Sequence, residues 1–224
     1  ALSLAAVPTF ATRWLIPRLP QLAELHPDIV VHIDTQTRPF LFADTTFDAA
    51  LYAGTPAQVA HWPGVQAQLL MHEDVVPVCS PRLLESAAPR GRGRAHQPVA
   101  AEALADLPLL QQSTRPYGWR QWFDAMGVDA PHALDGPRYE LFSMLAVAAT
   151  HGMGVALMPP LLIEAELASG ELVVACNRPL RGERAYYLIS PAQAQPPVLT
   201  TFAQWLLTMA QTATSAAGQA GGAG

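Results

Sequence analysis

Short apolar runs of strand length alternate with amphipathic helical segments along most of the chain, and this alternation constrains the fold most strongly. LSLAAV at 2–7 is a strand candidate, and the helical pattern after it repeats leucine at steps of three and four residues, up to His26. Pro17 and Pro20 predict an irregular first turn in that helix. Further strands are expected at 29–35 and 47–52. Strands that alternate with helices favour an α/β fold with a parallel sheet.

The rest of the chain continues the alternation. Ser80 and Pro81 are typical helix-start residues, and they open a short helix behind the apolar strand at 73–81. Glycine is expected to stop the apolar helix that ends before GMG at 152–154, and Gly170 is expected to stop the helix that follows. Additional helices are predicted at 119–127, 139–150, 161–170 and 200–210, and additional strands at 155–159, 171–176 and 184–190.

Composition excludes several classes of function. Only 14% of the 224 residues are charged and the net charge is -5, so the chain lacks a basic surface for nucleic acid; the basic run at 90–94 is interpreted as a solvated loop. Cys79 and Cys176 lie far apart without a CxxC motif, which predicts no metal site and no redox pair. No run reaches membrane-spanning length, so we expect no membrane association and a cytoplasmic location. Residues 213–224 are small and polar and are predicted to form a disordered tail.

No enzyme motif is present: the sequence lacks GxSxG, HExxH, GxxxxGK and GxGxxG. A hydrolase or dehydratase would need a placed acid and base, and the acids near the first strands are Asp34, Asp44 and Asp48. Asp48 is better interpreted as a cap at the start of its strand. We therefore expect neither catalysis nor a cofactor.

Two similar segments suggest a ligand site. VPTFATRWL and LQQSTRPYGWRQW each join a strand end, a hydroxyl-bearing turn and a helix start with an aromatic residue. A helix N-terminus attracts anions, so Thr9 and Ser113 are candidate contacts for a small anionic metabolite. The alternative is that these hydroxyls only cap their own helices. Tyr52 and Gly54, at a strand end, and Ser143, a lone hydroxyl in an apolar helix, are further candidates.

The chain resembles the effector-binding (substrate-binding) domain of LysR-type transcriptional regulators. The likeness is carried by VPTFATRWLIPRLPQLAELHPDIVVHIDT, by FDAALYAG, by WPG and VVPVCSPRLL, and by LLQQSTRPYGWRQWF with GMGVALMPPLLI. These segments span nearly everything before the tail. Within the family the sequence is most similar to the subgroup of glycine-cleavage and β-lactamase activators.

The resemblance implies a type 2 periplasmic-binding-protein-like α/β fold, with two Rossmann-like subdomains and a small-molecule effector in the cleft. Subdomain I is expected at 1–76 plus 187–212 and subdomain II at 77–186. The resemblance also implies self-association as a dimer or tetramer, and contact with operator DNA only through an N-terminal winged helix-turn-helix that this sequence does not contain. The effector-binding residues that it implies are Thr9, Phe10, Tyr52, Gly54, Ser113, Thr114, Ser143 and Tyr186.

One alternative from another class stays open at this point. A periplasmic solute-binding protein of a transporter would share the fold and the cleft. The loop at 88–98 is longer than is usual in the family, which leaves the boundary of the subdomains near it open.

Overall fold

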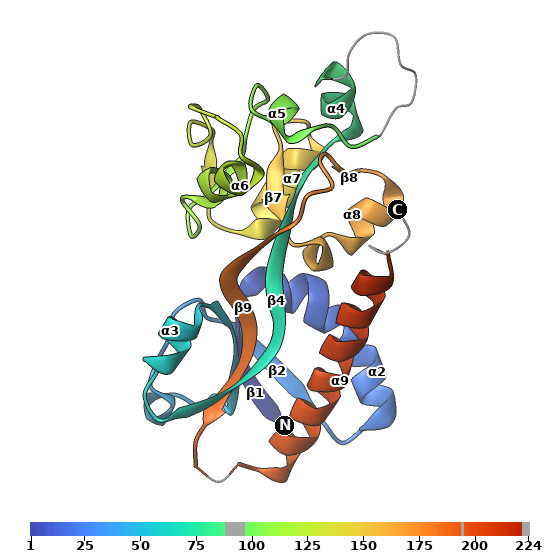
Figure 1. The fold of residues 1–224 in the computed structure, drawn as a ribbon. Coiled ribbons are helices and arrows are strands. Elements are labelled where there is room, and N and C mark those ends of the chain that lie inside the picture. The colour runs from blue at the N-terminus through green and yellow to red at the C-terminus, as the bar shows by residue number, and fades with distance from the viewer. Residues whose placement is uncertain (88–96, 194, 221–224) are drawn as a thin grey trace. The chain divides into compact units, whose positions relative to one another are not determined.

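The computed structural model describes residues 1–87, 97–193 and 195–220 (Figure 1). The chain divides into two compact units. Unit 1 comprises Ala1–Glu73 and Glu183–Gly224, and unit 2 comprises Asp74–Gly182. The chain passes from one unit to the other within two long strands, β4 (Val65–Cys79) and β9 (Leu180–Pro191).

The sheet of unit 1 is mixed rather than purely parallel. β1 (Leu2–Ala6) lies between β2 (Val31–Thr35) and β3 (Ala49–Gly54) and is parallel to both. β9 then pairs with β3 in the antiparallel direction, and β4 follows it in the sheet order. The expectation of a parallel sheet was therefore wrong for β9. Hydrophobic alternation marks a strand but does not reveal its direction, which the path of the chain decides.

The first helical run of unit 1 changes its winding three times. α1 (Pro8–Phe10) continues into a π-helical turn, η1 (Ala11–Leu15), a 3₁₀ turn, η2 (Ile16–Arg18), and then α2 (Leu19–Leu25). The two prolines lack the N–H that a regular helix would use, so the irregular turns fall where the sequence predicts them.

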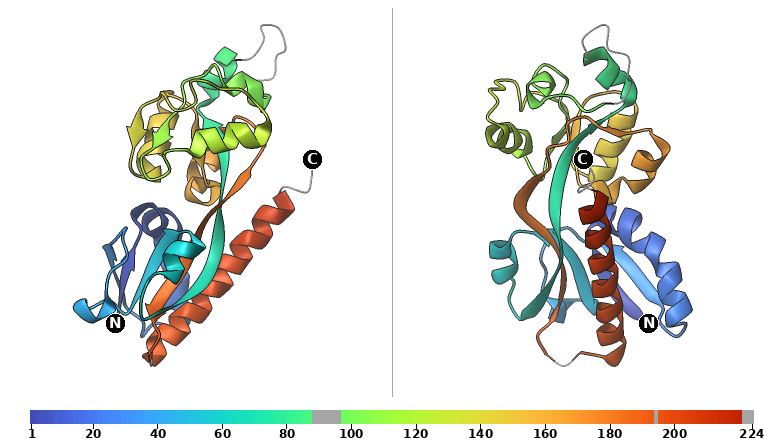
Figure 2. Two further views of the ribbon diagram at one scale, coloured as in Figure 1. Left: turned by 60° about the vertical axis from the view of Figure 1, so that its left-hand side comes forward. Right: turned by 45° about the vertical axis from the view of Figure 1, so that its right-hand side comes forward.

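Helices cover both faces of this sheet. α2 and the C-terminal helix α9 (Pro197–Ala220) lie on one side, and the short α3 (Pro56–Ala60) lies on the other (Figure 2). A 3₁₀ turn, η3 (Phe42–Asp44), lies in the link between β2 and β3. α9 continues to Ala220, through most of the segment whose composition predicts a disordered tail. Once a helix is nucleated by packing, alanine-rich sequence extends it at little cost.

Unit 2 is built around the distal part of β4. β7 (Ala156–Met158) and β8 (Val173–Val174) both pair antiparallel with β4, and β5 (Gln111–Gln112) pairs parallel with β6 (Arg138–Tyr139). The surrounding helices are α4 (Pro81–Ala87), α5 (Ala101–Leu104), α6 (Gly118–Met126), α7 (Phe142–Thr150), η4 (Pro160–Leu162) and α8 (Glu164–Ser169).

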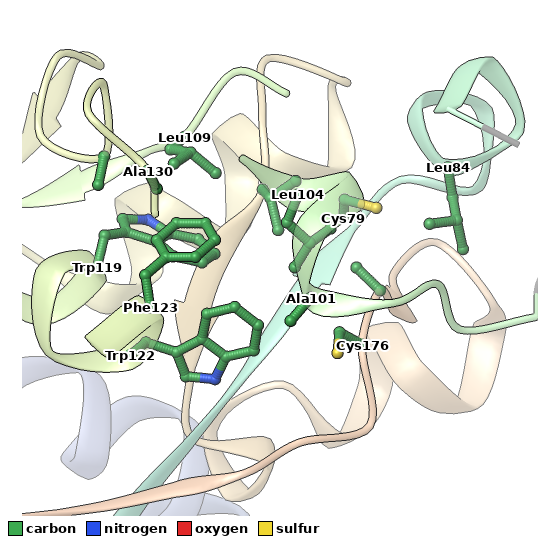
Figure 3. Close-up of a cluster of buried hydrophobic side chains, with 13 residues drawn as sticks. Cys79, Leu84, Ala101, Leu104, Leu109, Trp119, Trp122, Phe123, Ala130 and Cys176 are labelled. Carbon is green, nitrogen blue, oxygen red and sulfur yellow. The ribbon is translucent and has the colours of Figure 1, made fainter. Parts of the chain in front are cut away.

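An aromatic cluster on α6 forms the core of unit 2. Trp119, Trp122 and Phe123 are at most 2% exposed, and their ring centroids lie 5.1 to 5.7 Å from one another. Figure 3 shows these rings beside Leu104 and Leu109, with both cysteines in the same cluster. These aromatic residues are spaced three and four positions from Trp119, and they share one buried face of α6.

Several boundaries differ from the sequence-based expectations. β4 begins at Val65, eight residues before the predicted strand. The prediction missed this part because most of the added residues are exposed. α7 begins at Phe142 and not at Tyr139, which instead pairs with β5. Ser80 is confirmed as a helix-start residue, since its Oγ accepts a hydrogen bond from the Leu83 N–H at 3.4 Å. The basic run at 90–94 and most of the long loop at 88–98 lie outside the described residues.

Candidate functional site

The first candidate element is the start of the helical run in unit 1. β1 ends at Ala6 and α1 begins at Pro8, so the strand passes almost directly into the helix. Thr9 lies inside the first helical turn and is 6% exposed. The N-cap residue is Val7, which supplies no side-chain cap. The amides of the first turn therefore lie just past the end of the strand, at the positive end of the helix dipole. This geometry favours an anion.

Phe10 is packed between two other aromatic rings. Its ring stacks on Trp14 at 4.9 Å and on Tyr186 at 4.6 Å, and its side chain is only 1% exposed. Trp14 in turn carries the Arg18 guanidinium 4.4 Å above its ring. The structure thus brings the predicted residues Phe10 and Tyr186 together and gives Phe10 a packing role that fixes the position of α1. Whether it also contacts an effector stays a prediction.

Tyr52 and Tyr186 lie on opposite faces of the sheet. In the antiparallel register Tyr52 pairs with Tyr187, and Ala53 pairs with Tyr186. Neighbouring residues of a strand point to opposite faces of the sheet. Tyr52 packs instead against Trp62, at 5.3 Å, in an aromatic cluster near α3. Burial raises the pKa of the Tyr52 phenol above its usual range, and the Arg184 guanidinium partly offsets this effect. The effector-binding residues that the resemblance implies in unit 1 are therefore divided between the two faces of the sheet.

Gly54 has a local reason for being glycine. A Cβ at this position would come within 2.8 Å of the Gln58 Oε1 and 2.9 Å of the Tyr52 Cζ. Gln58 belongs to a capping box with Thr55, in which each side chain bonds the backbone of the other residue. Gly54 makes room for the Tyr52 ring at the point where β3 passes into α3. Its role as an effector contact is an untested prediction.

The second candidate element is the turn after β5 in unit 2. The N–H of Ser113 donates to the carbonyl of Tyr139 at 3.0 Å, which ties the turn to β6. Trp119 Nε1 donates to the carbonyl of Leu110 at 2.9 Å, just before β5. The buried amide of Gln111 donates to the carbonyl of Ala133 at 2.9 Å. Ser113 and Thr114 are both exposed, so a rigid scaffold presents two accessible hydroxyl residues.

The same turn carries a cation that sequence reasoning did not single out. Arg115 Nη1 donates to the Thr114 Oγ1 at 2.8 Å, and the guanidinium lies 4.6 Å above the Phe142 ring. Phe142 is the first residue of α7, and the half-buried Ser143 follows it. The structure therefore brings the Ser113–Thr114 turn to the start of the helix that carries Ser143. The signal in the sequence was the charge that directly follows the two hydroxyls in STR.

The capping alternative for these hydroxyls is not supported. α1, α6 and α7 begin without a side-chain cap, and their N-cap residues are Val7, Tyr117 and Leu141. Thr9 is helical itself, and α6 starts four residues after Thr114. The hydroxyls therefore do not serve as N-caps of these helices.

Asp48 and Cys79 have structural roles. Asp48 Oδ2 accepts a hydrogen bond from the Ser3 N–H at 2.8 Å, and the Asp48 N–H donates to the Ser3 carbonyl at 2.8 Å, so Asp48 links β1 to the start of β3. Burial raises the pKa of the Cys79 thiol to about 11, with a smaller opposing effect from a backbone hydrogen bond at Leu84. A thiol with so high a pKa is a poor nucleophile at neutral pH.

Among the helices in the described part of the chain, none combines the length and the apolar character that crossing a bilayer requires. Within residues 1–87, 97–193 and 195–220, no three or more His, Cys, Asp or Glu side chains gather in a way that could bind a metal ion.

The comparison with protein families decides the class of this chain. The LysR substrate binding domain matches residues 1–211. The chain belongs to this LysR family. The family's solved effector domains have the type 2 periplasmic-binding-protein-like fold, which agrees with the two α/β units described above.

Individual LysR relatives cover almost the whole chain. The glycine cleavage system transcriptional activator of Escherichia coli K12 is 31% identical over 211 residues, which are 94% of this chain and 65% of that protein. The transcriptional activator AmpR of Rhodobacter capsulatus is 32% identical over 88% of this chain and 63% of its own length. The effector domain of the transcriptional regulator AmpR of Pseudomonas aeruginosa has a similar structure, with a TM-score of 0.80, 25% identity and 98% of both chains covered. The chain spans just under two thirds of the curated relatives' length.

Proposed function

We propose that this chain is the effector-sensing domain of a cytoplasmic LysR-type transcriptional regulator. The observation that carries the proposal is the family match over residues 1–211. The relatives are named as transcriptional regulators, which favours this function over a transporter's solute-binding protein or an enzyme. Contact with operator DNA would belong to a separate N-terminal domain, in keeping with the net charge of -5 here.

We assign the effector to the two hydroxyl-bearing elements, one in each unit, which we propose act as regulatory subdomains I and II. Thr9 would contact it from the first turn of α1, and Ser113, Thr114 and Ser143 from unit 2. The uncapped helix starts and the accessible hydroxyls favour a carboxylate or a similar anion. An effector with different affinities for two arrangements of the domain would shift their populations, and 1 to 3 kcal/mol is a typical size for such coupling.

A thermal-shift screen tests this assignment. The domain would be melted against amino acids, small carboxylates, aromatic acids and cell-wall peptides. At a hundred times its dissociation constant, an effector adds about 2.7 kcal/mol to the free energy of unfolding, which is a shift of several degrees. Thr9→Val and Ser113→Ala should lose the shift. Thr208→Ala, which removes an exposed hydroxyl on α9, should keep it. If no compound stabilises the wild type, or if all three variants respond like it, the assignment fails.

We also propose that the domain self-associates as a dimer or tetramer. In unit 1, Ile16 and Leu25 are 47% and 59% exposed on the helical run, and Val30 next to β2 is 52% exposed. These apolar side chains are a suitable contact surface for a second copy. Sedimentation velocity over a range of concentrations should show association that Leu25→Glu weakens. A protein that stays monomeric at the highest concentration would contradict this part of the proposal.

A further inference from the structure

Arg115 has the features of a side chain that is positioned for binding. Its guanidinium is fixed on one side by the Thr114 hydroxyl, at 2.8 Å, and on a flat face by the Phe142 ring, at 4.6 Å. Both partners belong to unit 2, and the residue is half-buried. A long cationic side chain held at two points loses less conformational entropy when a ligand binds than one that moves freely in water.

The surroundings of Arg115 provide complementary groups for an anion. The guanidinium lies at the start of α7, which is the positive end of the helix dipole. This helix has nine residues and begins without a side-chain cap. Ser113 and Thr114 precede it on the same turn, and Ser143 follows Phe142 on α7. A planar guanidinium presents its N–H donors in a fork that matches a carboxylate, and the bond to Thr114 and the stack on Phe142 fix the direction of that fork.

Two other arginines of unit 2 have described side-chain contacts away from this turn. Arg181 pairs with Asp74 through two bonds of 2.8 and 2.9 Å, and Arg120 Nη1 donates to the Ala130 carbonyl at 3.2 Å. Arg115 is the arginine that directly follows the two hydroxyls on the candidate turn.

We propose that Arg115 binds the anionic group of the effector and thereby selects carboxylates over neutral molecules of the same shape. This inference rests on the proposed function, since it assigns one residue to that effector site. The competing role is structural, in which Arg115 only fastens the turn to α7. The two roles differ in one respect: only the first makes a small anion bind at this position.

Acetate and its neutral analogue acetamide separate the two roles. The isotope-labelled 224-residue chain would be titrated with each to about 100 mM at constant ionic strength, following the backbone amides by NMR. We expect acetate, and not acetamide, to shift the resonances of 113–115 and 142–143 in a saturable way, with a dissociation constant of about 1 to 10 mM. Arg115→Gln should weaken acetate binding by at least about tenfold. Arg82→Gln, the same charge change at an exposed site on α4, should leave it unchanged.

Three results would overturn the inference: no acetate shifts at this turn, equal shifts with acetamide, or unchanged acetate binding in Arg115→Gln. The melting screen keeps this question separate from the proposed function. If a screened effector binds the wild type and Arg115→Gln equally well, the proposed function stands and the role of Arg115 is wrong. If acetate binds through Arg115 while no other screened compound stabilises the domain, the anion site stands and the assignment of an effector to the two hydroxyl-bearing elements fails.

Discussion

The ring of Phe10 stacks on the ring of Tyr186, with centroids 4.6 Å apart and planes 17° apart. Phe10 lies in the first turn of the helical run after β1, while Tyr186 lies on β9, more than 170 residues later in the sequence. One contact therefore joins the first candidate element to a strand that continues into unit 2. The rings fix where Thr9 is presented, because Thr9 and Phe10 share the first turn of the helix.

Loss of this stack should destabilise unit 1. Phe10→Ala removes a ring that is 1% exposed and stacked on two others, so we expect a loss of about 3 to 5 kcal/mol in the free energy of unfolding. Ile16→Ala, on the same helical run, removes a side chain that is 47% exposed and should cost less than about 1 kcal/mol. Urea denaturation followed by circular dichroism measures both. Equal losses in the two variants would contradict the packing role of Phe10.

Gly54→Ala should destabilise the protein although it adds only one methyl group. The new Cβ would lie 2.9 Å from the Tyr52 Cζ, and the ring cannot retreat freely because it packs against Trp62. We expect a loss of about 1 to 3 kcal/mol by chemical denaturation. Gly182→Ala is the matched control, since a Cβ there meets nothing within 4 Å. A Gly54→Ala protein as stable as the Gly182→Ala protein would show that the site relaxes easily.

The buried thiol of Cys79 predicts a loss of stability in alkali. The folded state raises its pKa from 9.0 to about 11, so the folded protein holds this proton more tightly than the unfolded chain. Below about pH 9 this difference in pKa stabilises the folded protein by about 2 to 3 kcal/mol, and the stabilisation is lost as the pH rises towards 11. Urea denaturation at pH 7 and pH 10 under reducing conditions measures the change. Cys79→Ala should show a smaller decrease; an identical decrease would exclude Cys79 as its source.

The ion pair of Arg181 with Asp74 should contribute little to the free energy of unfolding. Arg181 Nε and Nη2 donate to the two carboxylate oxygens at 2.8 and 2.9 Å, but the side chains are 61% and 40% exposed. Such pairs contribute about 0 to 1 kcal/mol and are screened by salt. A double-mutant cycle with Asp74→Asn and Arg181→Gln should give a coupling in this range that decreases in about 1 M NaCl. A coupling that salt does not change would contradict simple screening of an exposed pair.

Most elements of the fold were predictable because hydrophobic periodicity is local. The strands at the N-terminus, the aromatic face of α6 and the cap at Ser80 follow from residues a few positions apart. The early part of β4 was missed since its residues are mostly exposed. The length of α9 was missed since alanine-rich sequence takes its structure from the helix that it extends.

The candidate site was predictable only in part. The hydroxyl turns are visible in the sequence because each follows an apolar strand. Arg115 was not singled out, because the Phe142 ring that positions it approaches it only in the folded unit. Tyr52 and Tyr186 were grouped because the family resemblance implies both as effector contacts, and the register of β3 with β9 separates them onto two faces.

The sequence by itself determined the α/β class, the helix start at Ser80 and the positions of the hydroxyls, because these depend on short-range periodicity and turn chemistry. Only the tertiary structure decided the direction of β9, the stack of Phe10 on Tyr186 and the place of Arg115 beside α7. These features join residues that are distant in the chain, and such pairings depend on how the whole unit buries its apolar surface.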